Sequence, residues 1–117
     1  MSPCTIYHNP RCSKSRQTLA LLQENGVQPE IRLYMTEAYS EQELRNTLDL
    51  LAITPRQLLR TKEAAYKELG LNNSELDDNQ VISAMLQEPK LIERPVVICG
   101  DKAAIGRPPE NVLEILS

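Results

Sequence analysis

The chain contains no phenylalanine and no tryptophan, and its four tyrosines are the only large aromatic side chains. A protein that stacks nucleobases on aromatic platforms, or encloses a quaternary ammonium group in an aromatic cage, needs rings that this sequence largely lacks. Aliphatic side chains must therefore fill the core. With 117 residues, 41% hydrophobic and 25% charged, the sequence is typical of a globular protein with one core, and we expect a single domain over residues 1–117.

Excess basic charge and long apolar runs are also missing. Thirteen Lys and Arg against sixteen Asp and Glu give a formal net charge of -3, which favours neither nucleic acid nor an anionic membrane as a partner. No stretch approaches the roughly 20 apolar residues of a membrane span. The N-terminus lacks the basic start and apolar stretch of a secretory signal. We therefore expect a cytoplasmic protein with no nucleic-acid or membrane partner.

Cysteine and histidine are scarce. The three cysteines, Cys4, Cys12 and Cys99, form no CxxC pair, and His8 is the only histidine, so the sequence predicts no metal site. An odd cysteine count without the spacing of a disulfide framework is typical of a reducing compartment. Cys4 and Cys99 each lie in an apolar, strand-like run. This setting favours packed core thiols over reactive ones.

The order of local patterns predicts an α/β fold. Short apolar or β-branched runs predict strands at residues 4–7, 30–34, 95–99 and 103–105. Helical spacing and capping signals predict helices at residues 12–26, 40–51, 54–60, 63–69, 77–88 and 108–116. The resulting order is β-α-β, a helical insertion at about 40–88, then β-β-α. It describes a mixed four-stranded sheet flanked by helices, the element order of a thioredoxin-like domain.

The loop between the first strand and the first helix carries the strongest chemical signal. Residues 8–16 read HNPRCSKSR, which places Cys12 at the expected start of the helix. Free backbone N–H groups and the positive end of the helix dipole stabilise a thiolate there. Arg11, Lys14 and Arg16 add three cations, although for Lys14 a solvated helix face is the favoured interpretation. We therefore predict a lowered pKa and a nucleophilic role for Cys12.

His8 stands four residues before Cys12. An imidazolium there could hold the thiolate, and a neutral ring could take the thiol proton. The alternative is a loop histidine bonded to the backbone. Because Cys12 has no CxxC partner, redox chemistry at this sulfur needs electrons from an external thiol, or from a more distant internal pair, which we consider the weaker option.

Three further arginines lie at boundaries between the expected elements. Arg60 ends a helical segment, Arg94 precedes Pro95, and Arg107 precedes a Pro-Pro pair. Single arginines usually lie on surfaces, and their spacing alone does not bring these three together. A thiolate that attacks a tetrahedral oxyanion, however, must overcome repulsion between negative charges, and guanidinium groups bind such oxygens in a fixed geometry.

Four separated motifs together carry a family resemblance. They are HNPRCSKSRQTL at 8–19, LLR at 58–60, LIERPVV at 91–97 and GRPPENVLEIL at 106–116. In this order they resemble arsenate reductases of the glutaredoxin-linked, thioredoxin-fold type, the ArsC family, and within it the short YfgD-like branch. The resemblance covers essentially the whole chain. Plasmid-type members differ in two ways: they have Gly-Thr where this chain has Ser13-Lys14, and they continue beyond the final helix.

The resemblance implies an oxidoreductase that reduces arsenate to arsenite, an activity associated with arsenical resistance. It implies that Cys12 attacks arsenate to form a covalent adduct and that His8 helps to keep the sulfur ionised. Arg60, Arg94 and Arg107 would hold the oxyanion, and the Arg94–Pro95 peptide bond would be cis. Glutathione would be the co-substrate and glutaredoxin the electron donor, with no bound cofactor.

Two alternatives remain open on sequence alone. Transcriptional regulators of the Spx type, which bind RNA polymerase, share the fold and often carry a CxxC switch. Ser15 stands at the corresponding second position here, and the three arginines are present, which favours an enzyme. A glutathione-linked thiol oxidoreductase with little arsenate activity is the other alternative.

Overall fold

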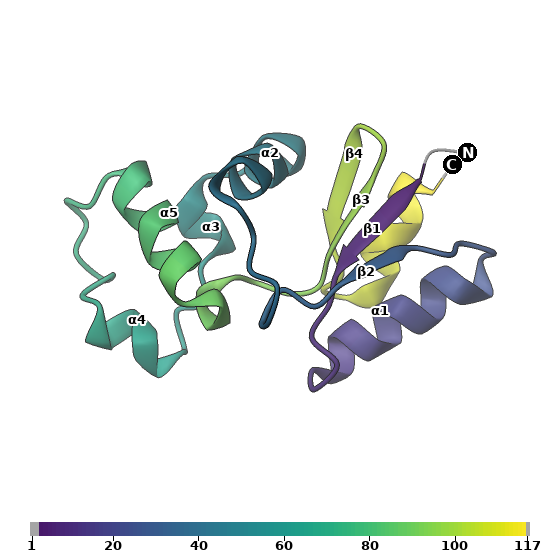
Figure 1. The fold of residues 1–117 in the computed structure, drawn as a ribbon, viewed down its shortest axis with the longest axis horizontal. Coiled ribbons are helices and arrows are strands. Elements are labelled where there is room, and N and C mark those ends of the chain that lie inside the picture. The colour runs from purple at the N-terminus through teal and green to yellow at the C-terminus, as the bar shows by residue number, and fades with distance from the viewer. Residues whose placement is uncertain (1–2, 117) are drawn as a thin grey trace. The chain divides into compact units, whose positions relative to one another are not determined.

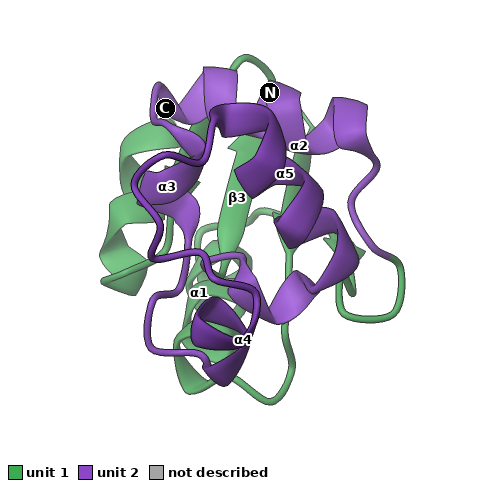
Figure 2. Cartoon of the chain, turned by 90° about the vertical axis from the view of Figure 1, so that its left-hand side faces the viewer, with its two compact units in different colours: residues 1–37, 94–117 green, residues 38–93 purple. Residues whose placement is uncertain are grey.

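The computed structural model of the chain describes residues 3–116 (Figure 1). Contacts between residues divide the chain into two compact units (Figure 2). Unit 1 comprises residues 1–37 and 94–117, and unit 2 comprises residues 38–93. The strands of the sheet belong to unit 1, and the five central helical segments belong to unit 2. The expectation of one domain over the whole chain stays a prediction.

Unit 1 is built on a mixed four-stranded sheet in the order β2-β1-β3-β4. The strands are β1 (Cys4–Tyr7), β2 (Glu30–Arg32), β3 (Val96–Cys99) and β4 (Lys102–Ile105). Strand β1 pairs in parallel with β2 and antiparallel with β3, and β3 pairs antiparallel with β4. The predicted fold class is confirmed. The sheet adds the strand order and register, which the sequence patterns do not contain.

The core of unit 1 lies between the sheet and two helical segments, α1 (Ser13–Glu24) and η2 (Pro109–Ile115). Ile6 and Val97, which are paired neighbours in β1 and β3, meet Leu22 of α1 and Val112 of η2 in one buried cluster. All four side chains are fully buried, and the cluster is free of large aromatic rings. Aliphatic packing thus fills this core, as the composition requires.

Two elements of unit 1 differ from the expected ones. Strand β2 ends at Arg32 instead of residue 34, because the chain turns there: the N–H groups of Thr36 and Glu37 both donate to the carbonyl of Leu33. The last segment is a 3-10 helix, with hydrogen bonds that span three residues, such as Asn111 N–H to the Pro108 carbonyl.

Unit 2 contains α2 (Glu41–Leu51), α3 (Pro55–Leu58), α4 (Ala64–Glu68), α5 (Asp78–Gln87) and the 3-10 turn η1 (Pro89–Leu91). Three of the helices begin with capping boxes, at Ser40, Thr54 and Asp77. In each box the first side chain accepts a backbone N–H three residues later, and the side chain of that later residue accepts the N–H of the first. These starts follow from local sequence, and the structure confirms them.

The interior of unit 2 is also aliphatic. Leu44, Leu58, Val81 and Met85 are each fully buried. An isolated antiparallel bridge joins Leu59 to Ile92 and ties the chain after α3 to the chain after η1. Across residues 3–116, no helix combines the length and the apolar character that a membrane crossing requires.

Candidate active site at the Cys12 loop

Three chain segments meet at one edge of the sheet in unit 1. Tyr7 ends β1, Val96 begins β3 and Ile105 ends β4, and the register pairs Tyr7 with Val96 and Val96 with Ile105. The loop that follows β1, the segment that precedes β3 and the segment that follows β4 therefore leave from the same edge. Arg94 and Arg107 lie in the second and third of these segments. The topology thus brings two of the three predicted arginines to the Cys12 loop.

Cys12 is the residue that caps the N-terminus of α1. Its backbone is extended, with φ -96° and ψ 122°, and its carbonyl accepts the N–H of Arg16 as the first turn of the helix forms. The preceding loop is held by the Asn9 carbonyl, which accepts the Cys12 N–H at 2.9 Å, and by the Asn9 side chain, which accepts the Arg11 N–H at 3.0 Å. Cys12 is a free cysteine with 8% of its surface exposed. Its sulfur therefore lies at the positive end of a helix whose first turn carries no acidic side chain.

Two guanidinium groups contact the Cys12 sulfur. Arg107 donates from Nη2 to Cys12 Sγ at 3.4 Å, although the two residues are 95 positions apart in the sequence. The same side chain donates from Nε to the Arg94 carbonyl at 2.8 Å, which fixes its orientation. The side chain of Arg94 also hydrogen-bonds the sulfur. Cys12, Arg94 and Arg107 thus form one cluster.

The pKa of Cys12 lies below its ordinary value. Burial acts in the opposite direction and on its own raises the pKa of the thiol. The backbone N–H of Ser15, the hydrogen bond and positive charge of Arg94, and the backbone N–H of Lys14 together outweigh burial and lower the pKa. The lowered pKa was expected from the sequence, but its causes differ in part. The cations at the sulfur are distant in sequence, whereas Arg16 donates to the Pro10 carbonyl at 2.8 Å.

His8 is buried and lies against Ser15. Its Nδ1 atom is 2.6 Å from Ser15 Oγ, and the same hydroxyl oxygen accepts the Asn9 N–H at 3.0 Å. Burial, with a further contribution from the positive charge of Arg16, lowers the pKa of His8. The ring is therefore neutral near pH 7, which favours the neutral form of the two that the sequence left open. The His8 ring thus bonds to the Ser15 hydroxyl, and the backbone N–H of Ser15 in turn bonds to the Cys12 sulfur.

Gly106 allows the segment that carries Arg107 to approach α1. A Cβ atom at this position would lie 2.5 Å from Thr18 Oγ1 and 2.8 Å from Pro95 Cγ, closer than ordinary packing permits. The Gly106 N–H donates to the Pro95 carbonyl at 2.9 Å and joins the two arginine-bearing segments. The Arg94–Pro95 peptide is cis, as the resemblance implied, and the Arg107–Pro108 peptide is cis as well. Sequence reasoning did not identify Gly106 or Ser15 as part of the site.

Arg60, the third predicted arginine, lies in unit 2. Its backbone N–H donates to the Leu91 carbonyl at 2.7 Å, next to the bridge that follows α3. Its guanidinium group is near two carboxylates, with Nη1 3.7 Å from Glu63 Oε1 and Nε 4.0 Å from Glu93 Oε1. Within unit 2, Arg60 is thus a partly buried cation with acidic neighbours. Its role in binding an oxyanion stays a prediction.

The sequence profile of the ArsC family matches residues 7–115. This chain belongs to the ArsC family. It is 54% identical over 112 residues to a Haemophilus influenzae protein named arsenate reductase, covering 95% of this chain and 97% of that one. It is equally identical to the Escherichia coli protein YfgD over 95% of this chain and 94% of the relative. The solved structure titled arsenate reductase from Vibrio cholerae is 48% identical, covers 98% of both chains and superimposes with a TM-score of 0.95.

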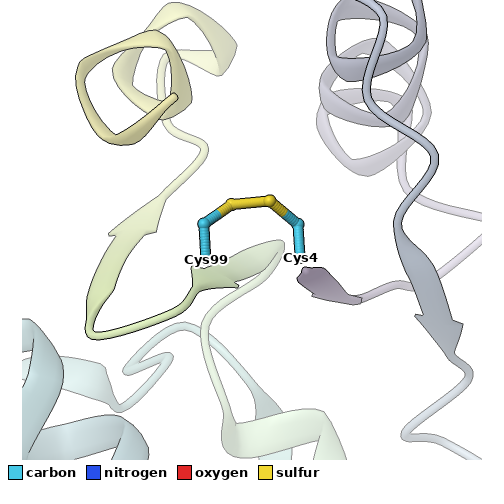
Figure 3. Close-up of a disulfide and its surroundings, with 2 residues drawn as sticks. All are labelled: Cys4 and Cys99. Carbon is cyan, nitrogen blue, oxygen red and sulfur yellow. A yellow bond between two sulfur atoms is a disulfide. The ribbon is translucent and has the colours of Figure 1, made fainter. Parts of the chain in front are cut away.

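One feature of this ArsC family chain corrects the sequence analysis. Cys4 and Cys99 are not free core thiols but are joined by a disulfide (Figure 3). The two residues are direct partners in the β1–β3 ladder, with Cα atoms 4.1 Å apart. The local apolar pattern is the same for a free and a bonded cysteine, and only the strand register reveals the pairing. The odd cysteine count therefore gives no support for a reducing compartment.

A cavity of about 250 Å³ borders the Cys12 loop of this ArsC family chain. Its lining comes from the end of β1, the loop and the turn after β2: His8, Asn9, Pro10, Arg11, Leu33, Met35 and Thr36. Leu33 and Met35 are each 38% exposed, so the cavity presents apolar surface beside the loop. Among the described residues, no group of three or more His, Cys, Asp or Glu side chains is arranged to hold a metal ion.

Proposed function

We propose that this protein is an arsenate reductase in which Cys12 is the nucleophile. The observation that carries the proposal is the cluster in which Arg94 and Arg107 both contact a sulfur whose pKa is lowered. Relatives named arsenate reductase share about half of the sequence over nearly the whole chain. Arsenate is a small tetrahedral oxyanion without an apolar body, which suits a site built from guanidinium groups and backbone N–H groups.

The two arginines solve an electrostatic problem. A thiolate and an oxyanion repel each other, and at about 4 Å the repulsion between unit charges is roughly 4 kcal/mol near a protein surface. Arg94 and Arg107 lie where both the sulfur and an incoming oxyanion would contact them, so they reduce this repulsion and orient the anion. The binding of the anion by Arg60 of unit 2 stays a prediction from the family resemblance.

In the first step, the Cys12 thiolate attacks the arsenic atom. The S–As bond forms from the sulfur electron pair, and one As–O bond breaks. The departing oxygen takes up protons and leaves as water. Arsenic stays in the +5 state in this step, so no reductant is consumed. The Ser15 and Lys14 N–H groups keep Cys12 ionised beforehand, and His8 fixes the position of Ser15 through its hydroxyl.

The remaining steps require external thiols, because Cys4 and Cys99 are paired with each other at the opposite end of β1 from the Cys12 loop. Glutathione replaces a second arsenic oxygen, which leaves as water. A glutaredoxin thiolate then attacks the glutathione sulfur. The bond between arsenic and the glutathione sulfur breaks, and its electron pair moves to arsenic and reduces it from +5 to +3. Hydrolysis releases arsenite and restores the Cys12 thiolate. A further glutathione reduces the glutaredoxin mixed disulfide. No bound cofactor is needed in this sequence.

The cavity beside the loop supports a place for the glutathione co-substrate. It combines a cation, Arg11, with the apolar side chains Leu33 and Met35. The loop residues that line it directly precede Cys12 in the sequence. Glutathione has two carboxylates and a thiol-bearing centre, so a cationic and partly apolar cavity suits it. We expect Met35→Asp to raise the KM for glutathione and to leave the KM for arsenate unchanged.

The deciding experiment measures arsenite formed from arsenate by the purified protein with glutathione, glutaredoxin and glutathione reductase. The Cys12→Ser protein should show only the background rate, because a serine hydroxyl is a poor nucleophile at neutral pH. Ser13→Ala is the matched control, since it changes the exposed neighbour and keeps the sulfur. Activity that persists in Cys12→Ser would refute the assignment of the nucleophile.

A second candidate function is thiol transfer to or from a glutathionylated substrate. The exposed apolar side chains Leu33 and Met35 beside the Cys12 loop favour it, since they can contact the peptide part of such a substrate. The same purified protein should therefore be assayed with a glutathionylated peptide. A rate with this peptide together with no arsenite from arsenate would favour the second candidate over the first.

A further inference from the structure

The Cys4–Cys99 pair lies at the position in the β1–β3 ladder where side chains approach most closely. Gly100 donates its N–H to the Pro3 carbonyl at 3.2 Å, a bond that flanks the pair on the outer side. This pattern identifies Cys4 and Cys99 as a non-hydrogen-bonded pair, and the Cα separation of 4.1 Å agrees. The two sulfur atoms are thus held within reach of each other by the backbone itself.

The same end of the ladder lacks one backbone hydrogen bond. An antiparallel pair normally exchanges two bonds at the flanking position, one in each direction. Pro3 has no N–H, so only the Gly100 donation remains there. The next chain segment after Cys99 is a turn, not a continued strand. A covalent bond between Cys4 and Cys99 therefore strengthens the ladder at an end where one backbone hydrogen bond is missing.

The disulfide also joins chain segments that are remote in sequence. Unit 1 is discontinuous, since residues 38–93 of unit 2 are inserted between its two segments. Cys4 belongs to the first segment and Cys99 to the second, and their sequence separation is 95. Bringing such distant segments together costs conformational entropy, which a covalent bond removes from the unfolded state. Figure 3 shows the bond spanning the ends of the two strands.

Burial separates this pair from the surface and from Cys12. Cys4 is 7% exposed and Cys99 6% exposed, and both belong to the buried cluster that includes Leu22 and Val112. Cys4 begins β1, whereas the loop with Cys12 follows the other end of that strand. The two cysteine sites therefore lie at opposite ends of β1, and Cys12 does not exchange directly with the disulfide.

We propose that Cys4 and Cys99 form a reversible redox site. In the oxidised state the disulfide joins the two segments of unit 1 covalently and raises the stability of this unit. A small-molecule disulfide oxidises the pair: one thiolate attacks it to form a mixed disulfide, and the second cysteine thiolate then displaces the remaining thiol. Two cysteine thiols and one RSSR give one protein disulfide and two RSH, with two electrons passing to the reagent. Reduction by two thiols reverses both steps. Because the sulfurs are nearly buried, exchange proceeds through opening of this strand end.

The test uses the Cys12→Ser protein, in which Cys4 and Cys99 are the remaining cysteines. One sample is treated with oxidised glutathione and another with dithiothreitol, and thiols are counted by alkylation in denaturant and intact mass. We expect none in the oxidised form and two in the reduced form. Thermal unfolding should show a Tm lower by about 10 °C in the reduced form. The Cys4→Ala, Cys99→Ala protein in the same background should give one Tm under both conditions.

A second readout tests the covalent link between the two segments on either side of the insertion. Trypsin cleavage at the exposed Lys62 or Lys67 of unit 2 should leave the fragments joined on a non-reducing gel and separate on a reducing one. Two free thiols in the oxidised sample, a stable glutathione adduct or a disulfide-linked dimer would each overturn the proposal. Equal Tm values for the oxidised and reduced forms would overturn the stabilising role. The comparison of redox forms needs no core substitution, so it remains decisive if the double variant does not fold.

Discussion

Cysteine sulfur atoms have opposite environments at the two ends of the sheet in unit 1. At one edge Cys12 is free, contacts two guanidinium groups and has a lowered pKa. At the other edge Cys4 and Cys99 are joined to each other inside an apolar cluster. The residue type is identical, and the surroundings differ in charge and in available N–H groups. The reactivity of each cysteine therefore depends on the charges and N–H groups around it at that end of the sheet.

The largest expected effect comes from removing the cations of the Cys12 edge. Arg107→Ala should lower kcat/KM for arsenate by about 10²–10³-fold, because a preorganised donor to the reacting anion is lost. Arg94→Ala should act similarly. Lys102→Ala is the matched control, since it removes an exposed cation of the same unit at the other end of the strands, where Lys102 pairs with Cys99. It should change kcat/KM for arsenate less than about threefold. Unchanged kinetics in both Arg94→Ala and Arg107→Ala would disprove the anion-binding role.

A pH titration sharpens the comparison next. The rate of Cys12 alkylation by iodoacetamide should rise with a midpoint below the roughly 8.5 of a free thiol, and Arg94→Ala should move the midpoint upward. Because the pKa is lower in the folded protein, the unfolded chain binds more protons between the two pKa values. The free energy of unfolding should thus rise with pH through this window and fall as pH drops through the folded pKa. Cys12→Ser should lose this component, and a midpoint at the free-thiol value would contradict it.

Gly106→Ala tests how the arginine-bearing segment reaches the helix. The added methyl group would overlap Thr18 Oγ1 and Pro95 Cγ, so we expect a loss of about 2 kcal/mol in the free energy of unfolding, measured by urea denaturation. Arsenate turnover should fall as well, since Arg107 would shift. Adding Thr18→Ala removes one of the overlaps and should recover part of the stability. If the double variant is no more stable than Gly106→Ala, the proposed contact is wrong.

Ser15→Ala should give the smallest effect. It removes the hydroxyl that binds His8 Nδ1 and the Asn9 N–H, but it keeps the backbone N–H that bonds to the sulfur. We expect a loss of about 1–2 kcal/mol in stability and only a small shift in the midpoint of Cys12 alkylation. Ser13→Ala serves as the control on the exposed face. A large upward shift of the midpoint in Ser15→Ala would assign the hydroxyl a direct part in thiolate stabilisation.

Local features of the fold were predictable because their causes are local. The capping boxes at Ser40 and Asp77 each depend on two residues three positions apart, and the helix start at Cys12 depends on its own loop. The nucleophile was predictable for the same reason. Strand register has no such local cause, so the contact of Cys4 with Cys99 was missed and two core thiols were expected instead.

The rest of the site depends on long-range pairing. Nothing in the spacing of Arg94 and Arg107 indicates that one donates to the carbonyl of the other, and the family resemblance supplied their role. The small volume required at Gly106 appears only when α1 lies against it. In the sequence, Ser15 stands out only as the position where a CxxC motif would have its second cysteine. Its hydrogen bond with His8 requires the loop to fold back on the helix.

The insertion of unit 2 has a consequence for the order of assembly during synthesis. Cys12 emerges from the ribosome early, whereas Arg107 follows 95 residues later. The helices of unit 2 rely on contacts between near neighbours and can form while the sheet still lacks β3 and β4. A nascent or truncated chain that ends before Arg94 therefore carries the cysteine without the two guanidinium groups that contact its sulfur. The pKa of Cys12 is therefore fully lowered only after the segment that carries Arg94 has joined the Cys12 loop.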